Sequence, residues 1–252
     1  MTNFWFIRHG ESESNAGIPV SNDATTPLTE LGIQQANRVA AHLQEPPDRF
    51  VVSPFYRTQQ TAAPTLLKFP DVPVETWPVH EFSYLSHEQS ENTTLKDRRK
   101  LSTPYFLTGD PDLILGDGGE SFNQFLARVD NSIARVQESQ DKNIIIFGHG
   151  WFMRALLWKL YTGINTPLEK RALLQRMSPV IVPSRFTFWL YSQAAKYPGI
   201  SQMMVFLLFS AVVRTPNCAI LKFKTESERV DFVGYDISHL PKSLRGTTMI
   251  NR

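Results

Sequence analysis

The sequence has a single cysteine, Cys218, among its 252 residues, which excludes a disulfide within the chain. A chain without disulfides fits a reducing compartment, so we expect a cytoplasmic protein. Positive and negative charges nearly balance, and the net charge is only +2 at pH 7. Such a balance does not favour nucleic acid as a partner.

Long hydrophobic runs are missing as well. The most apolar window, residues 203–213, is too short to cross a bilayer and contains Ser210. Few basic residues flank this window, which argues against binding to a membrane surface. The first residues, Met1-Thr2-Asn3, lack the basic segment of a secretory signal. We therefore expect no membrane partner.

Short apolar runs are present, and they alternate with helical patterns. Strands are predicted at 4–7, 50–52, 72–77 and 144–147, with two late strands at 219–221 and 230–233. Helices are predicted between them, one capped by Thr29 and another by Ser121 with Gln124. This order indicates an α/β fold, a three-layer sandwich whose mostly parallel sheet has helices on both faces and an antiparallel edge.

Histidine and arginine side chains follow three of these strands. Arg8 and His9 end the first strand, Arg57 follows the second, and His149 follows the run at 144–147. Ligands in such folds bind beyond the carboxyl ends of the strands, so we expect these residues to converge at one edge. Neutral imidazole is a nucleophile, and guanidinium groups favour an anion such as phosphate.

Two kinds of ligand come into question for this cluster, a zinc ion and a phosphoryl group. A zinc site needs at least one more histidine, cysteine or carboxylate nearby, and two arginines would repel a cation. A phosphoryl group fits better, because positioned cations stabilise the charge on its oxygens in the transition state. We therefore expect no metal and no cofactor. One histidine would attack phosphorus, and a general acid would protonate the leaving oxygen.

The motifs resemble those of the histidine phosphatase superfamily, the phosphoglycerate-mutase-like enzymes. The matching residues run in family order over most of residues 4–162: Arg8-His9-Gly10-Glu11-Ser12 with Asn15, Leu28-Thr29 with Gly32 and Gln35-Ala36, Ser53-Pro54 with Arg57-Thr58 and Thr61-Ala62, Gly119-Glu120-Ser121, and Gly148-His149-Gly150. The resemblance implies one domain over residues 1–252, with a polar excursion at 83–119 and an apolar insertion at about 165–215.

The resemblance also implies roles for individual residues. His9 is expected to be the nucleophile that is transiently phosphorylated. Arg8, Arg57 and Asn15 are expected to bind the phosphoryl oxygens together with His149. Glu81 is the expected proton donor because it directly follows the third strand region; Glu75 and Glu88 are the alternatives.

The implied activity is a metal-independent phosphomonoesterase that acts on a small phosphorylated metabolite. A phosphomutase is the alternative within the family, although residues 16–27 lack the longer stretch of the glycolytic mutases. A catalytically inactive relative that binds a phosphorylated ligand or a partner protein is the third hypothesis. The intact His9, Arg57 and His149 argue against that third hypothesis.

Two further segments carry expectations. The basic run from Lys96 to Lys100 is interpreted as a solvated helix face rather than a substrate contact. The apolar insertion must be covered, because a helix apolar on all sides cannot lie in water. We expect it to pack over the rim of the active site; a homodimer interface is the alternative cover.

Overall fold

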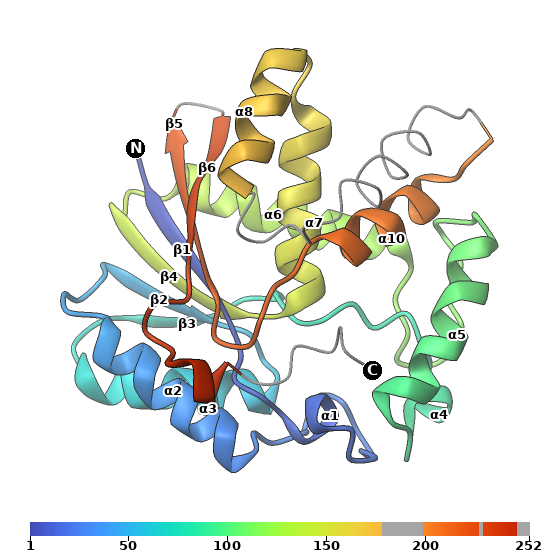
Figure 1. Ribbon diagram of the computed structural model, residues 1–252, viewed down its shortest axis with the longest axis horizontal. Coiled ribbons are helices and arrows are strands. Elements are labelled where there is room, and N and C mark those ends of the chain that lie inside the picture. Colours follow the sequence, from blue (N-terminus) through green and yellow to red (C-terminus); the bar gives the residue numbers. More distant parts are fainter. Residues whose placement is uncertain (178–198, 227–228, 246–252) are drawn as a thin grey trace.

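The computed structural model describes residues 1–177, 199–226 and 229–245 (Figure 1). The described strands form one six-stranded sheet in the order β3-β2-β4-β1-β5-β6. Their bounds are β1 Asn3–Arg8, β2 Arg49–Val52, β3 Val74–Thr76, β4 Asn143–Gly148, β5 Ile220–Glu226 and β6 Arg229–Asp236. Every strand predicted from the sequence is present.

The sheet is mostly parallel with an antiparallel edge. β1 and β2 both pair in parallel with the central β4, and β3 pairs in parallel with β2. β5 runs antiparallel to β1, and β6 runs antiparallel to β5. The α/β class and the antiparallel edge predicted from the sequence are confirmed.

Helices cover both faces of the sheet because the strands are apolar on both sides. Ile7, Ile145 and Phe147 face one core, which includes Val39 of α2 and Ala62 of α3. Alternate strand residues, such as Phe4 and Ile146, face a larger core formed with α6 and α7. Figure 1 shows these helix pairs on opposite sides of the sheet. Their bounds are α2 Glu30–His42, α3 Tyr56–Lys68, α6 Phe122–Glu138 and α7 Gly150–Gly163.

The predicted helix starts are confirmed. The Thr29 side chain accepts a hydrogen bond from the backbone N–H of Gly32, three residues into the turn that opens α2. Ser121 and Gln124 form a reciprocal capping box at the start of α6.

The excursion and the described part of the insertion both contain helices. The remaining helices are α1 Glu13–Ala16, α4 His87–Ser90, α5 Leu95–Leu107, α8 Pro167–Met177, α10 Gln202–Val212 and the short 3₁₀ helix η1 Lys242–Leu244. α10 packs against α7 and α5, and Phe206 and Phe209 on it are fully buried. The aromatic run 186–191, which belongs to the predicted insertion, lies outside the described residues. None of the described helices is long and apolar enough to cross a membrane.

Candidate active site

The carboxyl ends of β1, β2 and β4 bring two histidines together. His9 directly follows β1 and His149 directly follows β4, and these strands are parallel neighbours. The centroids of the two imidazole rings are 5.1 Å apart, and both side chains are buried. The convergence predicted from the strand order is therefore present in the fold.

The loop that carries His9 is held by residues far along the chain. The backbone N–H of Gly10 donates to Thr61 Oγ1 at 3.0 Å, and that of Glu11 donates to Gln35 Oε1 at 2.8 Å. A Cβ atom on Gly10 would lie 2.6 Å from the carbonyl oxygen of Gly32. Only glycine permits this close approach of two backbones. The motif residues of α2 and α3 thus fix the His9 loop.

Hydrogen bonds determine which nitrogen of His9 is free. Its Nδ1 lies 2.6 Å from the carbonyl oxygen of Gly10, which can only accept, so Nδ1 carries the proton. Nε2 therefore has the lone pair, and it accepts a hydrogen bond from Nε of Arg57 at 3.3 Å. Burial, with Arg57 and Arg8 close by, lowers the pKa of His9 well below its usual value. The imidazole is neutral at pH 7 and can act as a nucleophile.

His149 has the opposite proton arrangement. Arg57 Nη2 donates to its Nδ1 at 3.1 Å, so the proton lies on Nε2. That nitrogen is 2.8 Å from Ser53 Oγ and 2.9 Å from Thr58 Oγ1. Burial, followed by the charge of Arg57, lowers the pKa of His149 well below its usual value. Ser53 and Thr58 thus orient the ring.

Arg57 lies at the centre of the cluster. The first turn of α3 carries it, and its side chain is 3% exposed. Besides both histidines, it binds Asp23: Nη2 is 3.0 Å from Asp23 Oδ2, and Nη1 donates to the Asp23 carbonyl. One guanidinium therefore connects the two imidazoles to the loop at residues 17–27.

Arg8 and Asn15 are placed differently from Arg57. Arg8 Nη1 donates to the carbonyl oxygen of Thr215 at 2.6 Å, and its Nε has no partner among the described residues. Asn15 Oδ1 accepts from Asn217 Nδ2 at 2.9 Å, and Asn217 also donates to the carbonyl oxygen of His9. Asn217 thus joins Asn15 to the His9 loop. Asn15 lines the same cavity as His9, whereas Arg8 lines an adjoining cavity.

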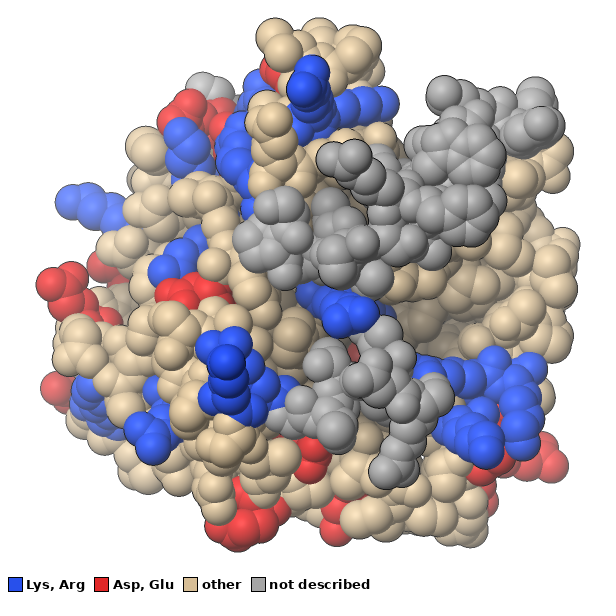
Figure 2. Space-filling model, viewed as in Figure 1, with Lys and Arg blue, Asp and Glu red and all other residues tan. Residues whose placement is uncertain are grey.

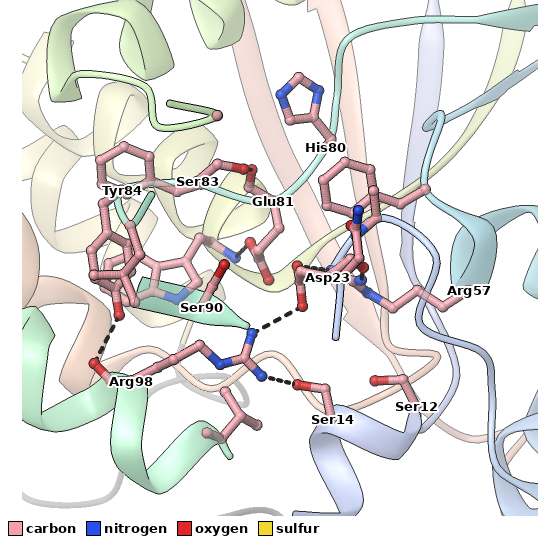
Figure 3. A pocket seen from close by; sticks show the side chains of 18 of the residues that line it. Ser12, Ser14, Asp23, Arg57, His80, Glu81, Ser83, Tyr84, Ser90 and Arg98 are labelled. Atoms are coloured by element: carbon pink, nitrogen blue, oxygen red, sulfur yellow. Dashed lines mark hydrogen bonds and ion pairs between the residues drawn. The ribbon is translucent and has the colours of Figure 1, made fainter. Parts of the chain in front are cut away.

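Glu81, in the segment after β3, lines the cavity beside His9 (Figure 3), and a carboxylate oxygen lies within 4.8 Å of a ring nitrogen of His9 and of His149. Its Oε1 accepts a hydrogen bond from the backbone N–H of Trp151 at 2.8 Å, at the start of α7. Burial raises the pKa of its carboxyl, and the charges of Arg57 and Arg8 oppose this rise only in part. A carboxyl with a raised pKa is suited to donate a proton near pH 7.

The two alternative glutamates lie elsewhere. Glu75 on β3 is paired with Arg49 and with Arg135, and it accepts from the Trp77 indole. Glu88 on α4 is exposed and is not among the residues that line the cavity beside His9. Of the three glutamates, Glu81 alone lies in that cavity.

Asp23 and Arg98 belong to the site but were not predicted. Arg98 Nη1 lies 3.1 Å from Asp23 Oδ1, and its Nη2 is 2.5 Å from Ser14 Oγ. Figure 3 shows both side chains at the cavity that also holds Glu81. The interpretation of the basic run as a solvated face is therefore wrong for Arg98, which is 8% exposed, although Lys96 and Lys100 are exposed.

A cavity of about 310 Å³ opens beside His9. Its lining combines polar side chains with the aromatic rings of Phe55, Tyr84 and Trp151. Burial raises the pKa of Tyr84 to about 12, so its hydroxyl is a neutral hydrogen-bonding group. A cavity of this size suits a small metabolite.

His9, Glu81 and His149 also lie close enough to hold a cation, because their candidate ligand atoms are within 4.8 Å of one another. The sequence argument against zinc relied on the absence of a third ligand near the histidines, and Glu81 supplies such a ligand. However, Arg57 donates to both His9 Nε2 and His149 Nδ1, so the lone pairs that would bind a cation accept from a guanidinium. This donor set favours an anion.

Comparisons with known proteins identify the family of this chain. The family model described as "Histidine phosphatase superfamily (branch 1)" matches residues 4–178. An adenosylcobalamin/alpha-ribazole phosphatase from Salmonella typhimurium is 32% identical over 161 residues, which are 63% of this chain and 79% of that protein. A probable phosphoglycerate mutase from Proteus mirabilis is 26% identical, over 75% of this chain and 88% of that one.

A solved structure has the same fold over nearly the whole chain. The structure of a phosphoserine phosphatase from Entamoeba histolytica superposes with a TM-score of 0.62 at 19% identity, covering 96% of this chain and all of that one. The family model spans well over half of the sequence, and the matched residues include His9, Arg57 and His149. The chain therefore belongs to branch 1 of the histidine phosphatase superfamily, and it is a phosphatase.

Proposed function

We propose that the protein hydrolyses the phosphate monoester of a small metabolite, without a metal, through a phosphohistidine on His9. The observation that carries this proposal is the tautomer of His9. Because Gly10 holds the proton on Nδ1, Nε2 presents a lone pair beside Arg57 in the cavity. The low pKa of His9 keeps this nitrogen unprotonated at pH 7.

In the first step, Nε2 of His9 attacks phosphorus and the bond to the ester oxygen breaks. Arg57, Arg8 and Asn15 bind the phosphoryl oxygens. His149 adds a contact when its Nδ1 takes up a proton beside the bound anion, because the neutral ring has no N–H free to donate. Glu81 gives its proton to the leaving oxygen, which departs as an alcohol. The raised pKa of Glu81 supports this role.

In the second step, water attacks the phosphohistidine. Glu81, now a carboxylate, takes a proton from the water, and the bond between phosphorus and Nε2 breaks. Inorganic phosphate leaves, and both His9 and Glu81 return to their starting protonation states. Arg57 binds the phosphoryl group in both steps.

The mutase alternative is favoured by one observation, the relative from Proteus mirabilis described as a probable phosphoglycerate mutase. A mutase transfers the phosphoryl group to a second hydroxyl instead of to water. Phosphoglycerate isomerisation that requires a bisphosphorylated cofactor, with little release of phosphate, would support this alternative.

The test begins with p-nitrophenyl phosphate and a panel of phosphorylated metabolites, including alpha-ribazole phosphate and phosphoserine, whose names occur among the relatives. Wild-type protein should release phosphate and acquire an acid-labile, base-stable label from radioactive substrate. His9→Ala should lose both, with an unchanged circular dichroism spectrum.

His80→Ala is the matched control, because His80 also lines the cavity and neither of its ring nitrogens bonds a described residue of the His9 cluster. It should still be labelled. Turnover by His9→Ala at the wild-type rate would overturn the phosphohistidine proposal.

A further inference from the structure

A second cavity adjoins the one beside His9. It has a volume of about 420 Å³, and the two cavities share six lining residues, among them Glu81, Arg98 and Trp151. α10 forms one wall through Leu207, Ser210 and Ala211. We call this cavity the arginine chamber, because five arginines line it: Arg8, Arg98, Arg99, Arg154 and Arg214.

These arginines come from separate parts of the chain. Arg8 ends β1, Arg98 and Arg99 lie on α5, Arg154 lies on α7, and Arg214 follows α10. Figure 2 shows lysine and arginine side chains beside a hollow in this face, where α5 lies in Figure 1. The acidic residues in the described lining are Glu11 and Glu81. The chamber therefore has an excess of positive charge, whereas the whole chain is nearly neutral.

Several residues that line the chamber carry hydrogen-bonding groups without partners. Among the described residues, Nε of Arg8, Arg98 and Arg214 is buried without an acceptor, and so are the hydroxyls of Ser210 and Thr215. Leaving buried donors unpaired costs free energy, and such groups are uncommon in folded proteins. All five groups belong to residues that line the chamber, so a hydrogen-bond acceptor bound there would lie close to them.

Repulsion between the arginines of the chamber also favours the binding of an anion. Burial, and then the neighbouring charge of Arg154, lowers the pKa of Arg8 to about 10. Burial also lowers the pKa of Arg154. An anion between these side chains would remove the repulsion and replace part of their lost hydration.

The scissile phosphate accounts for only part of this charge. In the mechanism proposed above, Arg57 and Arg8 match the two negative charges of one phosphate group. Arg99, Arg154 and Arg214 remain on the far side of the chamber. The leaving oxygen must lie at Glu81, which lines both cavities, so the rest of the substrate can extend into the chamber.

We propose that the arginine chamber binds a second anionic group of the substrate, carried on its leaving-group side. The preferred substrates are then small metabolites that bear a phosphate or a carboxylate in addition to the scissile phosphate. This inference rests on the proposed phosphatase function and deepens it. Charge-assisted hydrogen bonds from several arginines would supply the selectivity.

Three matched substrates test the wild-type protein: butyl phosphate, 4-phosphonooxybutanoate and butane-1,4-diol bisphosphate. They share the scissile group and differ at the far end, which is neutral, a carboxylate or a phosphate. We expect kcat/KM to rise by about tenfold or more from the neutral to an anionic end, equivalent to about 1.4 kcal/mol. The better of the two anionic ends identifies the second group.

Variants then locate the effect. Arg99→Gln, Arg154→Gln and Arg214→Gln should each reduce the advantage of the anionic ends by about threefold to tenfold, mainly through KM. Arg99 is exposed, so its variant tests the chamber even if the other two fail to fold. Arg38→Gln is the matched control, because Arg38 is exposed on α2, outside the chamber lining.

The outcomes separate this inference from the proposed function. Hydrolysis of p-nitrophenyl phosphate with equal kcat/KM for all three butyl substrates would overturn the chamber proposal and leave the phosphatase proposal intact. Absence of phosphate release from every substrate would overturn the phosphatase proposal itself. An anionic preference that survives in all three chamber variants would also contradict the assignment.

Discussion

The carboxylate of Asp23 lies 3.0 Å from the guanidinium of Arg57, the residue that contacts both active-site histidines. Its other oxygen lies 3.1 Å from Arg98. Burial alone would raise the pKa of Asp23, but the two arginines outweigh burial, so its pKa lies below the ordinary value. The carboxylate of Asp23 therefore pairs with Arg57 and Arg98 at the place where we expect a substrate anion.

Asp23→Asn should strengthen inhibition by inorganic phosphate. Removing the carboxylate frees Arg57 and Arg98 to bind the inhibitor, and we expect its Ki to fall by about threefold to tenfold, corresponding to on the order of 1 kcal/mol. The measurement is competitive inhibition of p-nitrophenyl phosphate hydrolysis at pH 7. Asp71→Asn, an exposed change outside both cavities, is the control. Weaker phosphate inhibition would mean that Asp23 orients Arg57 rather than competing with the ligand.

Glu81→Gln should slow alkyl phosphates far more than p-nitrophenyl phosphate. An alkoxide leaving group needs a proton, whereas p-nitrophenolate hardly does, and general acid catalysis is typically worth about 10²–10⁴-fold. Steady-state kcat on both substrates measures the difference. Glu88→Gln, a change on the exposed face of α4, should leave both rates unaltered. Equal losses on the two substrates in Glu81→Gln would assign proton donation to another group.

The pH dependence follows from the same carboxyl. Because burial raises the pKa of Glu81, the proton that it donates is lost as the pH rises through that raised value. Turnover of alkyl phosphates should therefore fall on the alkaline side, and this fall should be absent in Glu81→Gln. The pKa of His9 lies well below its usual value, so His9 is already deprotonated near neutral pH, and its titration should not affect kcat/KM there. An alkaline fall that persists in Glu81→Gln would contradict this assignment.

Dialysis against EDTA should leave the activity unchanged. Arg57 donates to the two imidazole nitrogens that would otherwise bind a cation, so positive charge at the site comes from the protein. Activity and metal content are measured before and after dialysis. Activity that disappears with EDTA and returns with zinc or manganese would show that His9, Glu81 and His149 form a metal site.

Phe206→Ala should destabilise the protein by about 3–5 kcal/mol, because it leaves a cavity where a fully buried ring was. That ring contacts Phe122, Trp151 and Trp158, so α10 is joined to the core that supports the active site. Urea denaturation measures the change in unfolding free energy. Phe206→Leu, which keeps most of the volume, should cost less. A loss below about 1 kcal/mol in the alanine variant would mean that α10 is not part of this core.

The sequence alone determined the sheet and the approximate position of the histidines. Strands such as 144–147 are short apolar runs, and Thr29 and Ser121 mark helix starts through local hydrogen bonds. Parallel strand order then requires His9 and His149 to meet at one edge. These features depend on periodicity and on neighbours close in the chain, which a sequence displays directly.

Only the tertiary structure decided how Asp23, Arg98 and the chamber arginines lie. Asp23 and Arg98 are 75 residues apart, and no periodic pattern relates an aspartate in a polar loop to one residue of a basic helix. The tertiary structure also decided which of the three candidate glutamates lies at the site. Glu81 lies there because it accepts a hydrogen bond from the backbone at the start of α7. Such placements follow from contacts between distant segments, where packing rather than local propensity determines the direction of a side chain.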